Sequence, residues 1–146
     1  METKTSINSL IVINNDRYEG YKKAAEETKD VDLKTLFTKF SIQSKGFGES
    51  LRPFNDTDDQ PKHDETTNSG KLYRVWMDVK AAMTANDRKA ILNSCEYGED
   101  VAKKTYDEVM EHADDVPSEV LDIIRKQRAE LQKAHDEVKA LRDAAV

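Results

Sequence analysis

The apolar side chains of this chain recur every three or four residues over four long stretches, and this spacing constrains the fold most. Between residues 6 and 29, and again between 32 and 54, the inward positions step by fours and threes. Such a spacing places the apolar side chains on one face of an α-helix. The resulting seam is typical of helices that pack at about 20° to one another in a bundle. We therefore expect long amphipathic helices.

The sequence predicts five helices in one domain, over residues 6–29, 32–54, 71–84, 87–112 and 117–143. The chain has only 5 glycines and 3 prolines, too few for the many turns of a β-sandwich or barrel. Residues 55–70 read as a loop, because they are polar, contain a proline and have no apolar period. Two helical hairpins joined by a long crossover, which carries the short helix 71–84, describe a ferritin-like up-down four-helix bundle.

Charge and cysteine content exclude several classes of partner. The net charge of −6 disfavours nucleic acid, since that affinity rests largely on Lys and Arg. It also disfavours docking on anionic lipid. The single cysteine, Cys95, cannot form an internal disulfide, which suits a reducing compartment. The apolar run at residues 10–13 is too short for a signal or a membrane span. We expect a soluble, cytoplasmic protein without nucleic-acid or membrane partners.

Glu99 stands where the apolar pattern of residues 87–112 expects a hydrophobic side chain. An isolated carboxylate in a dry interior is very unfavourable, so it must reach the bundle edge or find a buried partner. The candidate partners on the neighbouring helices are Asn14, Arg17, Tyr18, Gln127 and Arg128. We expect a polar layer in the core that helps to fix helix register, made up of Asn14, Tyr18, Glu99 and Gln127. Disturbing the hydrogen bonds of such a structural Glu99 should lower the stability by about 1–3 kcal/mol.

The alternative for Glu99 is a metal ligand, because ferritin-like bundles often hold two metal ions in their core. Such a centre takes one Glu from each of two helices and a Glu-x-x-His motif from each of the other two. The sequence contains no Glu-x-x-His. A looser carboxylate site for Fe, Mn or Zn remains open. Its candidate ligands are Glu99, Glu96, Glu130 and Glu19.

Four segments of the chain carry a family resemblance. They are INNDRYEGYKKAAEETKDVDLKTLF, RVWMDVKAAM, ILNSCEYGEDVAKKTYDEV and RKQRAELQKAHDEVKALRD. Together they resemble a family of uncharacterised bacterial ferritin-like four-helix-bundle proteins over nearly the whole chain. The resemblance implies an all-α ferritin-like bundle. It implies no activity, because the family is known mainly as a domain of unknown function.

The sequence favours a non-catalytic bundle without a cofactor, acting through packing or partner binding. A weak metal-binding or oxidase-like ferritin relative is the alternative. The helix around Trp76 has an apolar side that either covers one end of the bundle or forms a homodimer contact, and we expect a homodimer. Four glycines fall inside helical patterns, at positions 20, 46, 48 and 98. We interpret them as sites of close packing, with room for a ligand as the alternative.

Overall fold

The computed structural model describes residues 3–55, 71–112, 114 and 116–145, and these residues form helices and no strand. The α-helices are α1 (Thr3–Glu27), α2 (Val31–Leu51), α3 (Lys71–Thr84), α4 (Arg88–Met110) and α5 (Ser118–Ala144), and a short 3-10 helix, η1 (Arg52–Phe54), follows α2. The all-α prediction is therefore confirmed. Apart from Asn55, the predicted loop 55–70 lies outside the described residues. Among the described helices, none is long and apolar enough to cross a membrane.

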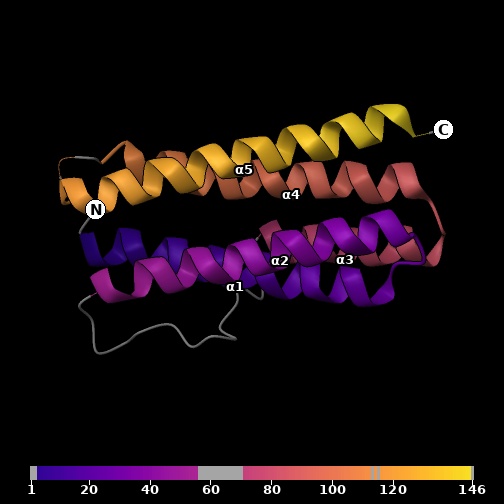
Figure 1. Cartoon of the computed structure of the whole chain (residues 1–146), viewed down its shortest axis with the longest axis horizontal. Helices are drawn as coiled ribbons and strands as arrows, with labels where there is room; N and C mark the ends of the chain where they lie inside the picture. Colours follow the sequence, from indigo (N-terminus) through magenta and orange to yellow (C-terminus); the bar gives the residue numbers. More distant parts are fainter. Residues whose placement is uncertain (1–2, 56–70, 113, 115, 146) are drawn as a thin grey trace.

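The helices form two antiparallel hairpins that pack against each other (Figure 1). One hairpin is α1 with α2, and the other is α4 with α5. Helix α1 packs on α4 and α2 packs on α5, so the four long helices enclose a common interior. Helix α3 lies along one half of this bundle, where it packs on both α1 and α4.

Short polar contacts fix where α4 begins. Asp87 caps this helix by accepting a hydrogen bond from the Ala90 backbone N–H at 3.0 Å. Asn86, in the turn that precedes it, adopts a left-handed conformation with φ of 55°, which asparagine tolerates better than most residues. Arg88 then pairs with Asp30 and Asp32. These ion pairs hold the start of α4 against the turn between α1 and α2.

The buried apolar side chains form two clusters, one toward each end of the bundle. At the end where α1 turns into α2, all five α-helices contribute, with Tyr21, Phe37, Phe40, Leu72, Val75, Leu92, Cys95 and Val138 among the members. At the opposite end the members include Ile7, Leu10, Leu51, Val109, Ile124 and Leu131. Helix α3 supplies side chains to the first cluster only. The bundle is therefore wider at the end that α3 covers.

Two glycines, one on α1 and one on α4, allow α3 to approach so closely. A Cβ atom on Gly20 would lie 1.8 Å from Cε2 of Trp76. A Cβ on Gly98 would lie 3.0 Å from Cγ1 of Val75. The indole of Trp76 also meets the ring of Tyr21 edge-on, with the ring centroids 4.9 Å apart. The structure thus favours close packing as the reason for these two glycines.

Two glycine-to-alanine changes should have opposite effects on stability. We expect Gly20→Ala to lower the free energy of unfolding by about 1–3 kcal/mol, because the new methyl group displaces Trp76. Gly46 is exposed, and a Cβ there meets no atom within 4 Å. Gly46→Ala should therefore raise stability by up to about 1 kcal/mol through helix propensity alone. Urea denaturation followed by far-UV circular dichroism measures the free energy of unfolding of both variants. Equal effects of the two changes would contradict this account of α3 packing.

Candidate functional site

A buried ion pair joins α1 to α4 near the middle of the bundle. Arg17 on α1 donates from Nε to Oε2 of Glu99 at 2.8 Å and from Nη2 to Oε1 at 2.7 Å. Each side chain is only 1% exposed. This two-point geometry is the strongest way for a guanidinium to hold a carboxylate. Glu99 is thus a buried acid with a buried counter-ion.

The remaining polar atoms of the pair are also satisfied. Tyr21 donates its hydroxyl hydrogen to Oε2 of Glu99 at 3.1 Å. Nη1 of Arg17 donates to Oγ of Ser44 at 2.8 Å and to the carbonyl oxygen of Phe40 at 3.3 Å. Both carboxylate oxygens therefore accept from protein donors, and the guanidinium is held from α2 as well as from α4. A buried pair is tolerable only when its hydrogen bonds are completed in this way.

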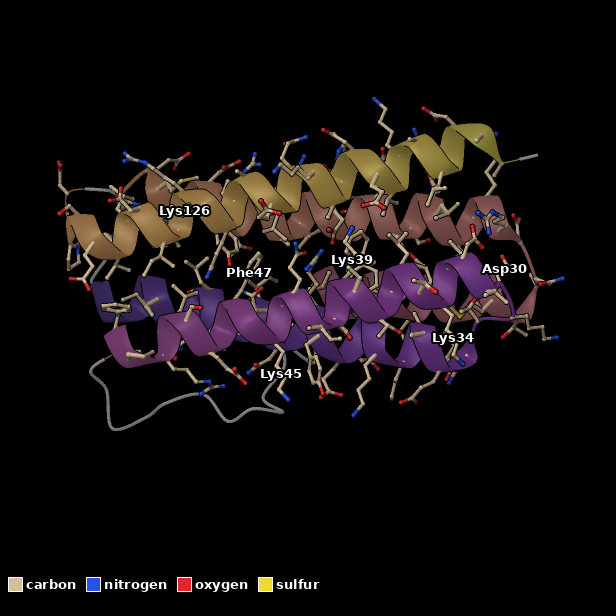
Figure 2. All side chains as sticks on the ribbon, in the orientation of Figure 1. Asp30, Lys34, Lys39, Lys45, Phe47 and Lys126 are labelled. Atoms are coloured by element: carbon tan, nitrogen blue, oxygen red, sulfur yellow. The ribbon has the colours of Figure 1, made fainter. Side chains whose placement is uncertain are left out.

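The hydrogen bonds continue from Ser44 to the far side of the bundle. Ser44 donates to Oδ1 of Asn14 at 3.0 Å, and Asn14 donates from Nδ2 to the Tyr106 hydroxyl at 2.8 Å. Tyr106 donates to Oε1 of Gln127 at 2.6 Å, and Gln127 donates to the Phe47 carbonyl oxygen at 3.2 Å. Figure 2 shows Phe47 on the side of α2 nearest α5. The network therefore connects all four long helices.

Burial and the ion pair set the charge of each group. Burial opposes the charge of Arg17, but attraction to Glu99 and their hydrogen bond outweigh it and raise the pKa of Arg17. Burial, with the negative charge of Glu99 nearby, raises the pKa of Tyr21 well above its usual value. Burial likewise raises the pKa of Tyr106 and of the Cys95 thiol. Both phenols and the thiol therefore stay protonated near neutral pH while they are buried.

Helix geometry explains which residues of α1 join the network. Asn14, Arg17 and Tyr21 are separated by three and four residues, so they share one helix face. Tyr18 follows Arg17 by one residue and is turned about 100° away from that face. Its ring is partly exposed and lies under the ammonium groups of Lys22 and Lys45, at 5.7 and 5.9 Å from the ring centroid. The observed polar layer differs from the predicted one at this position, since Arg17 and not Tyr18 points into the core.

The other members of the expected layer lie in the network. Asn14, Glu99 and Gln127 are buried and connected through it. Arg128, another candidate partner of Glu99, instead pairs with Asp107 at 2.7 Å. Tyr21, Ser44 and Tyr106 also belong to the network, although the expected layer did not include them. The sequence signal that could have identified them is a hydroxyl group on an inward helix face at the level of the buried Glu99.

The structure does not bring the four candidate metal ligands together. Glu99 is enclosed by Arg17, while Glu96 faces Arg142 and His135 at the edge between α4 and α5. Glu130 is exposed on α5, where it pairs with Lys133 at 3.3 Å. Glu19 lines a surface groove of about 490 Å³ between α1 and α2. Within the part of the chain that the structure describes, no group of three or more His, Cys, Asp or Glu side chains could hold a metal ion.

Residues 2–112 match the family model described as Domain of unknown function (DUF2383). The chain belongs to this family. The matched range includes α1, α2, α3 and α4, and with them both members of the Arg17–Glu99 pair. Gln127, on α5, lies beyond the matched range. No curated protein matches the chain.

Proposed function

We propose that this DUF2383 protein is a non-catalytic bundle that acts through packing and partner binding. The observation that carries the proposal is the Arg17–Glu99 pair. A carboxylate at mid-bundle is the group with which a ferritin-like centre would hold a metal ion. Here Arg17 supplies the positive charge beside that carboxylate, and Tyr21 donates a further hydrogen bond to it. A metal would have to displace a buried guanidinium, which would then lack a counter-ion.

We also propose that the bundle is ferritin-like in topology. Two antiparallel hairpins, joined by one long connection that carries α3, support this assignment. In such a bundle the polar network would define how the hairpins align. A shift of one hairpin along the other would separate Arg17 from Glu99 and break the hydrogen bonds that run from Ser44 to Gln127. Buried polar groups of this kind are known to specify register.

Metal addition tests the non-catalytic assignment. We expect Zn(II), Mn(II) or Fe(II) to leave the free energy of unfolding unchanged. A metal bound by the folded state would instead raise it by about 2.7 kcal/mol at a free concentration 100 times the dissociation constant. The measurement is urea denaturation with and without each ion, together with the metal content of the purified protein. Retention of one or two ions per chain, lost in Glu99→Gln, would overturn the assignment in favour of a metal-binding ferritin relative.

The partner we propose is a second copy of the chain. Tyr73 and Met77 support this, because they lie one turn apart on α3 and are 47% and 50% exposed. The expected result is a concentration-dependent dimer in sedimentation equilibrium, rising above the 16.6 kDa of one chain. Met77→Lys should shift the association toward the monomer. A single-chain mass at every concentration would contradict the dimer but would leave the assignment of Glu99 untouched.

A further inference from the structure

Every long helix of the bundle is joined to its neighbours by side-chain hydrogen bonds or ion pairs. Arg17 joins α1 to both α2 and α4, and Tyr106 joins α4 to α5. At the surface, Lys39 on α2 pairs with Glu137 on α5. Helix α3 differs. Its described side chains, residues 72–84, make no hydrogen bond or ion pair to another helix, and Thr84 bonds only within α3. Over residues 72–84, the side chains of α3 contact the other helices through apolar packing alone.

The indole of Trp76, which packs on α1, also lacks a hydrogen bond within the described part of the chain. Nε1 of Trp76 is buried and has no hydrogen-bond partner among the described residues. This donor would be hydrated if α3 moved away, so the docked state carries a penalty that the open state does not. A helix as short as α3 is marginal in water without its packing partner. Release from the bundle would therefore melt α3 and expose its backbone amides.

The surface beneath α3 is a distinct part of the core. It includes Gly20 and Gly98, which leave room for Trp76 and Val75 because they have no side chains. Cys95 lies in the same apolar cluster as the buried face of α3 and is completely buried. The four long helices are meanwhile held together by the network centred on Arg17 and Glu99, to which α3 contributes no side chain.

We propose that α3 is a displaceable cover, which opens as a unit while the four long helices remain folded. Opening separates Trp76 from Gly20 and uncovers the groove between α1 and α4. Cys95 then becomes accessible to solvent. The motion takes place within one chain, but the proposed dimer contact through Tyr73 and Met77 lies on α3 and would slow it. It is therefore tested at concentrations at which the chain is a monomer.

Hydrogen exchange followed by mass spectrometry, with the full chain at increasing urea, tests this opening. The α3 amides should exchange at least about tenfold faster than those of α4 and α5, with a weaker urea dependence, because a local opening exposes less surface than global unfolding. Labelling of Cys95 by a thiol-reactive disulfide reagent should report the same opening. If α3, α4 and α5 exchange at one rate with one urea dependence, the proposal is overturned.

Two variants separate local opening from a general loss of stability. Trp76→Ala should raise the exchange rate of α3 and the labelling of Cys95 by at least about tenfold, since it removes the contacts of the indole with Gly20 and Tyr21. Ile124→Val is the control, because Ile124 is fully buried in the cluster to which α3 does not contribute. It should leave the local exchange of α3 unchanged. An equal effect of both variants on α3 would contradict a separate opening.

Discussion

Replacement of Glu99 by glutamine is expected to lower the free energy of unfolding by about 3–5 kcal/mol, measured by urea denaturation. The substitution leaves the guanidinium of Arg17 charged and only 1% exposed, without a counter-ion. It also replaces one of the two acceptor oxygens by an NH₂ group, which cannot accept from Arg17 or Tyr21. The sequence, which does not show the partner of Glu99, predicts a smaller loss of stability, about 1–3 kcal/mol, from the lost hydrogen bonds alone. The larger value applies because the variant leaves the buried positive charge of Arg17 without a counter-ion.

A matched change at the surface provides the control. Lys39 and Glu137 also form an ion pair between helices, but their side chains are 61% and 44% exposed. Figure 2 shows Lys39 on the side of α2 nearest α5. Glu137→Gln should lower stability by less than about 1 kcal/mol, since solvent screens such pairs. The double variant Arg17→Met, Glu99→Leu should recover most of the loss, because it removes both buried charges. A loss for Glu99→Gln no larger than that for Glu137→Gln would contradict the buried-pair description.

Raising the pH above about 8.5 is expected to destabilise the fold steeply. The folded state raises the pKa of the buried Cys95, Tyr21 and Tyr106, so it keeps three protons that the unfolded chain releases. Stability is therefore complete below the unfolded pKa values, about 8.5 for cysteine and about 10 for tyrosine, and falls as pH rises above them. Each group contributes about 1.4 kcal/mol per pH unit. The total loss at pH 11 reaches about 6 kcal/mol.

Substitution of Cys95 or Tyr21 shows which group causes the fall in stability in each pH range. Urea midpoints are measured from pH 7 to 11 for the wild type, Cys95→Ala and Tyr21→Phe. Cys95→Ala should flatten the dependence from about pH 8.5 upward, whereas Tyr21→Phe should flatten it only above about pH 10. The slopes matter here, because each variant also changes the stability at neutral pH. Identical slopes in all three proteins would show that these groups do not retain their protons in the folded state.

The surroundings of each candidate acid depend on which neighbouring helix lies beside it. The period of apolar residues along one helix does not give this. The sequence predicts one possible metal site, with the candidate ligands Glu99, Glu96, Glu130 and Glu19. The structure separates them because Glu96 lies at the edge between α4 and α5, Glu130 is exposed and Glu19 faces the groove between α1 and α2. One residue of helix corresponds to about 100° of rotation. An error of one position in the inward phase therefore moves a side chain from the core to the surface.

The sequence alone determined that the chain is helical and that Glu99 occupies an inward position, because both follow from the local period of apolar residues along a helix. Only the tertiary structure decided that Arg17 rather than Tyr18 meets this acid, and that α3 rests on Gly20 and Gly98. These contacts depend on the rotation and distance between helices that are far apart in sequence. That relative placement is set by the packing of the whole core, not by any one segment.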